Sequence, residues 1–229
     1  MKPVKQYPRS NMTQVSAEEL KLDLEDFKKK AMELGATDAQ LIPASYITID
    51  ERVWMKCLIP RCRGLSNGGS PYCPPNTPPP EFMRKVLDRY SWAILFKREI
   101  NNLQDYVPVS EAQMAEMQKR HDVSEGYHKK TFDITGGLES YIQSKGYYLA
   151  LGLSGGSCRL QLCRGAKCGV LENGTCRFPL QSRPSLEAVS IDVFQLAGKV
   201  GWDTHMIRRI EPNRDNIPCG VSIGMVLVC

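Results

Sequence analysis

The sequence predicts a single α/β domain: a mixed sheet of about five strands with flanking helices and two cysteine-rich metal-binding loops. Three observations support this fold class. Strand-like apolar runs alternate with segments of helical periodicity along the 229 residues, as in α/β proteins. Hydrophobic residues make up 42% of the chain, which is enough for a sizeable core. No repeat, low-complexity tract or shift in composition marks a flexible linker.

The first predicted element is a helix at 16–34. Ser16 and Glu19 have the spacing of a capping box, in which each side chain satisfies a free backbone N–H of the other residue. Gly35 follows as a stop signal. The apolar residues at helical spacing are Leu20, Leu24, Phe27, Ala31 and Leu34. We assign this helix to an N-terminal segment, 1–36, and the α/β domain to 37–229.

The middle of the chain combines strands, helices and the first cysteine loop. A strand-like segment covers 39–54, and the cysteine loop follows at 57–75. Pro80 suits the first turn of a second helix, and 92–96 has the apolar character of a short buried strand. From Ser110 to about residue 145 the chain is polar and mostly helical, with a break expected at the glycine pair 136–137.

The last third of the chain is predicted to form two strands with a helix between them in the sequence. Residues 147–153 form a strand that runs into the second cysteine loop, 155–180. Pro184 opens a helix that extends past Leu196, with Glu187 in its first turn, where the helix dipole favours an acidic side chain. The final apolar run, 221–228, predicts a central strand.

Charge and hydropathy exclude several classes of protein. The net charge of +5 is mild and no strong basic run occurs, so the chain carries no strong nucleic-acid signal. No apolar stretch approaches the roughly 20 residues of a membrane span. The N-terminus is polar and lacks the apolar core of a secretory signal. These features predict a cytoplasmic protein.

Cysteine is the most informative residue type. An odd number of cysteines in a chain without an export signal argues against a disulfide framework. In a reducing cytoplasm, clustered thiols become metal ligands or redox groups. The nine cysteines are Cys57, Cys62, Cys73, Cys158, Cys163, Cys168, Cys176, Cys219 and Cys229.

The first predicted metal-binding group is Cys57, Cys62 and Cys73. The ten residues before Cys73 are rich in glycine, serine and proline, so this loop can turn backbone N–H groups towards sulfur. Three cysteines leave one position of an iron–sulfur cubane open for a substrate, a cofactor or water. Cys219 is an alternative fourth ligand, whereas Cys229 is interpreted as an incidental residue at a strand end.

The second predicted group is Cys158, Cys163, Cys168 and Cys176. Four thiols within nineteen residues complete a tetrathiolate site, which suits either zinc or an iron–sulfur cluster. Several glycines give this loop the backbone freedom to wrap around a centre.

Basic residues surround the second group. Four thiolates leave excess negative charge on a metal centre, so nearby cations stabilise the centre and raise its reduction potential. We assign Arg177 and Arg183 to cofactor binding. The alternative is that these cations are solvated surface charges. The basic residues are Arg159, Arg164, Lys167, Arg177 and Arg183.

Other motifs carry less information. The glycines from Gly152 to Gly156 follow a strand but lack the rest of a dinucleotide-binding fingerprint, so we interpret them as part of a cluster loop. His121 and His128 lie seven positions apart and could share a helix face, but a solvated face explains them better. His205 stands alone.

Several stretches resemble one known family. They are Tyr72-Cys73-Pro74-Pro75, the glycine-rich run into Cys158, Cys176-Arg177-Phe178-Pro179, 183–188, 191–194 and the apolar 224–228. In order and spacing they are similar to the predicted metal-binding proteins with domain of unknown function 2284, which are cysteine-rich and common in anaerobic bacteria and archaea. The resemblance spans about 37–228 and implies metal binding without an established reaction.

Three functions remain open from the sequence. The first is an iron–sulfur protein in electron transfer or redox chemistry, with one or two [4Fe–4S] clusters and a redox partner protein. The second is an iron–sulfur enzyme with an open iron at the three-cysteine loop. The third is a zinc-stabilised interaction module without catalysis.

Overall fold

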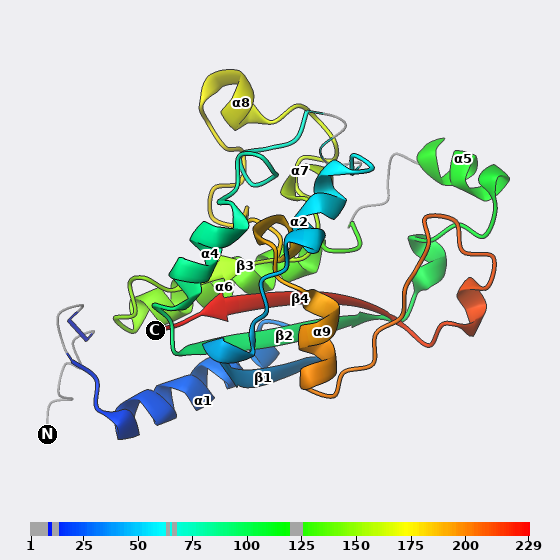
Figure 1. Ribbon diagram of the computed structural model, residues 1–229. Coiled ribbons are helices and arrows are strands. Elements are labelled where there is room, and N and C mark those ends of the chain that lie inside the picture. Colours follow the sequence, from blue (N-terminus) through cyan, green and yellow to red (C-terminus); the bar gives the residue numbers. More distant parts are fainter. Residues whose placement is uncertain (1–8, 11–13, 63–64, 66–67, 120–125) are drawn as a thin grey trace, which may run out of the picture.

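Figure 1 shows the computed structural model, which describes residues 9–10, 14–62, 65, 68–119 and 126–229. An open sheet forms its centre, and every neighbouring pair of strands is antiparallel. The strands occur in the order β1 (Asp38–Pro43), β2 (Trp92–Ile100), β4 (Gly220–Leu227) and β3 (Leu151–Leu153). The single α/β domain is confirmed. The predicted mixed sheet of about five strands is wrong, because the described residues form four antiparallel strands.

The antiparallel direction of the strands could not be predicted, because the central strands are buried on both faces. In β2, Ala93 and Leu95 belong to one core, whereas Ile94 and Phe96 belong to the other, and none of the four is solvent-accessible. Such continuous apolar runs are typical of parallel strands with both faces covered. Here helices cover both faces of an antiparallel sheet, so the apolar pattern is the same. The predicted central strand near the C-terminus is confirmed as β4.

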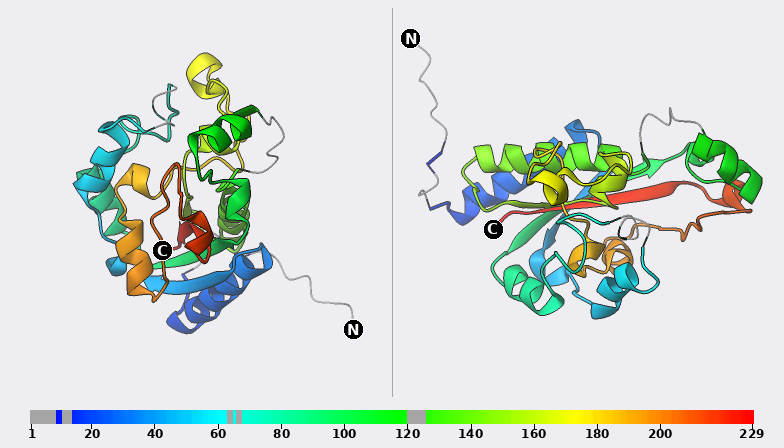
Figure 2. Two further views of the ribbon diagram at one scale, coloured as in Figure 1. Left: turned by 90° about the vertical axis from the view of Figure 1, so that its right-hand side faces the viewer. Right: turned by 90° about the horizontal axis from the view of Figure 1, so that it is seen from above.

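Helices form a layer on each side of the sheet (Figure 2). On one side, α1 (Ala17–Glu33) and α6 (Lys129–Ser144) pack against the sheet through a shared core. On the other side, α4 (Pro80–Leu87), the short turn η3 (Glu187–Val189) and α9 (Val193–Lys199) pack through a second core. The cysteine loops lie beyond one edge of this three-layer domain.

The N-terminal helix matches its sequence signals. The Glu19 backbone N–H donates to Ser16 Oγ at 3.2 Å, and the Ser16 backbone N–H donates to the Glu19 carboxylate at 3.1 Å, which completes the capping box. Gly35 has a φ of +107°, a conformation that favours glycine after a helix. The division of the chain at residue 36 stays a prediction.

Two predicted elements are wrong because polar side chains start helices inside them. The strand expected at 39–54 ends at Pro43, and η1 (Ala44–Tyr46) and α2 (Glu51–Leu58) follow it. Asp50 caps α2 by accepting a hydrogen bond from the Arg52 backbone N–H at 2.8 Å. The helix expected from Pro184 is divided into η3 and α9. Ser190 has a φ of +71° between them, and Asp192 caps α9.

The polar helical stretch divides at a different place from the one predicted. Its described parts are α5 (Glu111–Lys119) and α6, and the glycine pair expected to break it lies inside α6. A Cβ atom on Gly136 would strike the Leu180 carbonyl, so this glycine lets the second cysteine loop approach the helix. The strand predicted at 147–153 is shorter, since β3 covers only its end.

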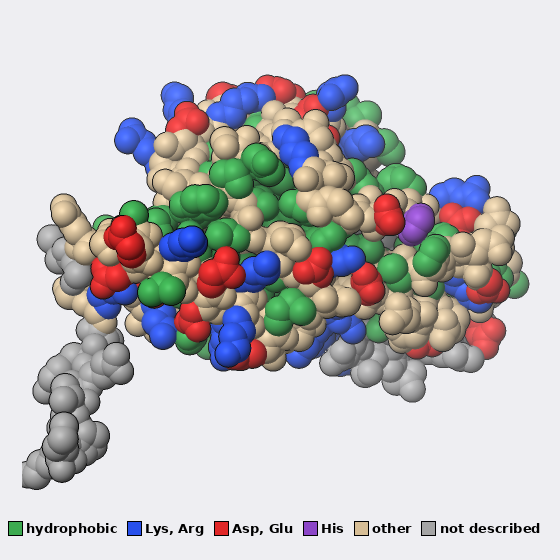
Figure 3. Space-filling model, turned by 90° about the horizontal axis from the view of Figure 1, so that it is seen from below, with side chains coloured by type: hydrophobic (Ala, Val, Ile, Leu, Met, Phe, Trp, Pro, Cys, Tyr) green, Lys and Arg blue, Asp and Glu red, His purple; other side chains and the backbone are tan. Residues whose placement is uncertain are grey.

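No helix in the described part of the chain is long and apolar enough to cross a membrane. Acidic and basic side chains are interspersed over the face in Figure 3, without a large patch of one sign. This distribution fits the mild net charge of +5.

Candidate metal centre

The first cysteine group lies at the end of α2 and in the loop that follows it. Cys57 occupies the last turn of the helix, and the Cys62 backbone N–H donates to the Cys57 carbonyl at 3.1 Å. Burial, together with the neighbouring Cys62, Glu187 and Cys73, raises the pKa of the Cys57 thiol to about 12. The three cysteines are therefore neighbours in space, and a bound cation would offset the cost of ionising them.

The second cysteine group surrounds a small cavity. Cys158 begins α7 (Cys158–Gln161), and Cys168 precedes α8 (Gly169–Asn173). The cavity has a volume of about 20 Å³, and Cys158, Cys163, Cys168 and Cys176 all line it. The loop thus brings the four predicted ligands around one space.

The Cys176 sulfur has two polar groups within hydrogen-bond distance. The Phe178 backbone N–H donates to Cys176 Sγ at 3.4 Å, and Ser182 Oγ lies 3.2 Å from the same sulfur. Donors of this kind stabilise thiolates and raise the reduction potential of an iron–sulfur centre.

Ser70 connects the two cysteine groups. Its side chain is completely buried, and its Oγ lies 3.4 Å from Cys73 Sγ and 3.6 Å from Cys158 Sγ. The pKa of the Cys158 thiol is raised to about 12, mainly by burial; the Ser70 hydrogen bond acts to lower it and the nearby Cys73 to raise it. Two groups 85 positions apart in the sequence, counted from Cys73 to Cys158, therefore lie side by side in the fold.

The cysteine side chains in the described part of the chain do not converge on a single ion. Among the described residues, no three His, Cys, Asp or Glu side chains are grouped closely enough to hold a single metal ion. Tetrahedral zinc, with Zn–S bonds of about 2.3 Å, needs sulfurs roughly 3.8 Å apart. The sulfurs of the second group instead surround the small cavity.

Arg159 supplies a buried positive charge next to the second group. Its side chain lines the same cavity and is 2% exposed. Nη1 donates to the carbonyls of Gly165 at 2.9 Å and Ala166 at 3.1 Å. Nε and Nη2 have no hydrogen-bond partner in the described part of the chain. A buried guanidinium without a carboxylate is costly, so this position requires a counter-charge.

The comparison with known families agrees with this geometry. A family model described as "Predicted metal-binding protein (DUF2284)" matches residues 40–228. The chain belongs to this family. No curated protein and no solved structure matches the chain. The DUF2284 match includes all seven cysteines of the two groups, and it establishes predicted metal binding but not the identity of the metal.

The two arginines assigned to cofactor binding in this DUF2284 chain have protein partners. Arg177 lines the cavity of the second group, and its guanidinium donates to the Lys167 carbonyl at 2.6 Å. Arg183 pairs with the buried Glu139, with Nε donating to the carboxylate at 2.6 Å. Glu139 also accepts from the Gly152 backbone N–H at 2.8 Å. The cofactor role of both arginines stays a prediction.

The remaining cysteines lie elsewhere in the DUF2284 chain. Burial raises the pKa of the Cys219 thiol, and the groups that act on it are Glu99 and Lys97 rather than other cysteines. The Cys229 carbonyl accepts a hydrogen bond from the Trp92 backbone N–H at 2.9 Å, and burial raises the pKa of its thiol. All nine cysteines are free thiols.

Some side chains near the cysteines were missed or misjudged from the sequence. Ser70 stands three positions before Cys73, a spacing at which a turn brings two side chains together, and this signal could have identified it. The solvated position predicted for His128 is wrong, since the ring packs against the backbone of the second cysteine loop. His121 lies outside the described residues.

Proposed function

We propose that this DUF2284 protein binds two [4Fe–4S] clusters and takes part in electron transfer. Cys57, Cys62 and Cys73 would hold one cluster, and the four cysteines of the second group would hold the other. Bound iron–sulfur clusters supply one-electron redox chemistry. The nine free thiols suit a reducing, cytoplasmic compartment.

The buried charge of Arg159 is the observation that carries this proposal. A tetrathiolate centre is negatively charged, and the guanidinium lines the same cavity as the four sulfurs. The pairing would satisfy the two nitrogens that lack a partner in the described residues. It would also raise the reduction potential, because a nearby cation stabilises the added electron.

We favour clusters over zinc because the four irons of a cubane hold their thiolates further apart than a single zinc ion does. Soft thiolates serve both, so the types of ligand do not decide. A zinc site draws its ligands to within contact of one ion, whereas the described residues contain no such group of three. The Phe178 N–H donates to the Cys176 sulfur, and the Ser70 hydroxyl lies within hydrogen-bond distance of the Cys73 and Cys158 sulfurs; such groups tune a redox centre.

The position of the two groups suits the passage of electrons between them. Ser70 contacts a sulfur of each group, so the two centres would be neighbours. The group on α2 reaches the surface, where Cys57 and Cys62 are partly exposed and Ile59 is 69% exposed. We infer that a redox partner protein docks at this end.

Metal analysis after anaerobic purification tests the proposal. We expect iron and acid-labile sulfide in equal amounts, about eight of each per chain, with little zinc. Cys158→Ser and Cys57→Ser should each remove about half of the iron, and Cys229→Ser is the matched control that should keep it all. Zinc without sulfide would mean that the zinc-stabilised module is correct and that the clusters are not.

An iron–sulfur enzyme is the second candidate, and Glu187 favours it. This side chain acts on the Cys57 thiol and also lines a cavity of about 1070 Å³. Cys219 lies beside Glu99 and Lys97, so the first group has no nearby fourth cysteine in the described residues. A change in the spectrum of one cluster on addition of a small molecule would support an open iron position.

A further inference from the structure

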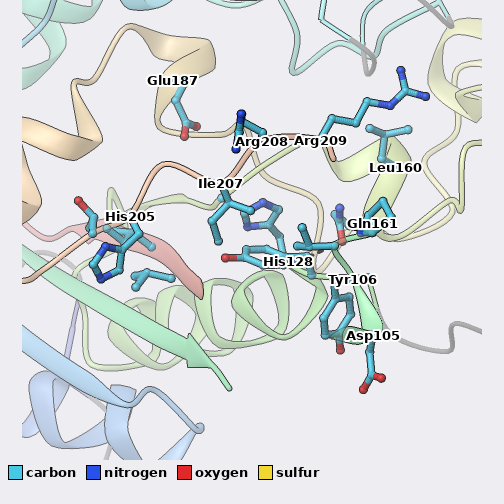
Figure 4. Close-up of a pocket in the computed structure, with 18 of the residues that line it drawn as sticks. Asp105, Tyr106, His128, Leu160, Gln161, Glu187, His205, Ile207, Arg208 and Arg209 are labelled. Atoms are coloured by element: carbon cyan, nitrogen blue, oxygen red, sulfur yellow. Dashed lines mark hydrogen bonds between the residues drawn. The ribbon is translucent and has the colours of Figure 1, made fainter. Parts of the chain in front are cut away.

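A large cavity lies beside the second cysteine loop, at the start of α6 (Figure 4). Its volume is about 1070 Å³, which is the size of a site for a cofactor or a drug-sized ligand. Its walls come from many parts of the chain. They include the region around η2 (Leu103–Asp105), α5, the start of α6, the second cysteine loop, the η3–α9 region, residues 204–209 and β4.

One wall holds a histidine whose position is fixed on both sides. His128 Nδ1 lies 2.7 Å from Ser222 Oγ, while the ring packs against the backbone of two glycines. A Cβ atom on Gly156 would approach His128 Cδ2 to 2.6 Å, and Gly156 has a φ of +71°, so only glycine suits this position. The other ring nitrogen has no hydrogen-bond partner in the described part of the chain. Figure 4 shows the ring inside the cavity.

Burial lowers the pKa of His128 to about 4, so the ring is neutral at physiological pH. Burial also raises the pKa of Glu187, which Figure 4 shows directed into the same cavity from the other side. The neutral His128 ring leaves a hydrogen-bonding group without charge inside the cavity.

Cations line the cavity as well. Arg208 pairs with Glu211 at 2.7 Å, but Arg164 and Arg209 have no ion-pair partner among the described residues. Arg164 has a φ of +50°, a conformation that is costly for a residue other than glycine. The chain therefore keeps an arginine where glycine would be less strained, and a function for its guanidinium explains this choice.

The rest of the lining is largely apolar. It includes Val107, Val193, Phe194, Ile207, Val221 and Ile223. A ligand that fits both parts of the wall carries an anionic group on an apolar body.

We propose that this cavity binds a small organic anion, in which a carboxylate or a phosphate monoester is attached to an apolar body. Arg164 and Arg209 contact the anionic group, and His128 donates or accepts a hydrogen bond deeper in the cavity. The inference rests on the cavity alone and holds whichever metal the cysteines bind.

Calorimetric titration of the full chain, purified without oxygen, tests this site. The probes are phenylbutyrate, phenyl phosphate, uncharged phenylbutanol and inorganic phosphate. We expect at least one of the two aromatic anions to bind about tenfold or more tightly than phenylbutanol and inorganic phosphate. Tighter binding of phenyl phosphate assigns a phosphate ester to the site, and tighter binding of phenylbutyrate assigns a carboxylate.

Variants separate the site from general charge effects. Arg164→Gly and Arg209→Gln should each weaken the anion about tenfold or more, whereas Arg89→Gln, which removes an exposed arginine outside the cavity lining, should have no effect. Arg164→Gly should keep its melting temperature within about 3 °C, because relief of backbone strain offsets the added freedom of glycine. The proposal is overturned if neither aromatic anion binds at millimolar concentration, if phenylbutanol binds equally well, or if both arginine variants bind like the wild type.

Discussion

Replacing Arg159 with methionine should have opposite effects on stability in the metal-free and metal-loaded protein. The guanidinium is 2% exposed, and two of its nitrogens lack a partner in the described residues. In the metal-free chain, this unpaired buried charge costs about 3–5 kcal/mol. Loss of the hydrogen bonds to the Gly165 and Ala166 carbonyls costs about 1–2 kcal/mol. The variant should therefore gain about 2 kcal/mol of unfolding free energy.

In the loaded protein the same substitution removes a counter-charge. A unit charge about 8 Å from an added electron, at an effective dielectric constant of about 20, contributes about 2 kcal/mol. For a one-electron couple this corresponds to a potential on the order of 90 mV. The second centre of the variant should therefore have a lower reduction potential by about that amount, and it should be lost more readily to a chelator.

Two measurements check the expected gain in metal-free stability and the expected fall in reduction potential. Urea unfolding of chelated, reduced protein gives the stability of the metal-free chain, and an anaerobic redox titration followed by electron paramagnetic resonance gives the potential. Arg159→Lys is the control, since it keeps the charge and should keep most of the potential. An unchanged potential in Arg159→Met, or a metal-free variant less stable than the wild type, would refute the assignment of Arg159 as a counter-charge.

Four other changes have defined outcomes. Ser70→Ala should lose about 1 kcal/mol in urea unfolding and lower the potential of both centres in the redox titration, because one hydroxyl contacts a sulfur of each group. Arg183→Met leaves the buried Glu139 unpaired and should lose about 3–5 kcal/mol, which Glu139→Gln in the same chain should largely restore. Normal iron content in that double variant would contradict the predicted cofactor role of Arg183. Gly156→Ala should lose about 2–4 kcal/mol, since it combines a φ of +71° with a clash against His128. The unfolded chain binds the His128 proton more tightly than the folded chain does, so the free energy of unfolding should fall as pH drops from 6.5 towards 4. The loss should be about 2 kcal/mol at pH 5. In urea unfolding, His128→Gln should flatten this decrease.

Local signals in the sequence predicted those parts of the fold that depend on neighbouring residues. The Ser16–Glu19 capping box gave the first helix to within one residue at each end, because its hydrogen bonds join residues three positions apart. Pro80 marked the start of α4 for the same reason, since its fixed φ suits a first turn.

Features that depend on distant contacts could not be predicted in this way. The antiparallel direction of the sheet depends on which strands meet, and the apolar pattern of β2 and β4 is the same for either direction. His128 is buried by two glycines and a serine that follow it by 27 positions or more, so its own neighbours suggested a solvated residue. Spacing divided seven of the cysteines into two groups, but it gave no sign that both groups contact Ser70.

Each cysteine group combines one buried thiol with more accessible ones, and this has a practical consequence. Cys73 and Cys158 are 7% and 9% exposed, whereas the other five cysteines of the two groups are more accessible. Oxygen that reaches the protein during handling will therefore find accessible sulfur in both groups. Samples exposed briefly to air should be mixtures of fully and partly loaded molecules, so a single iron value should not be taken as the stoichiometry.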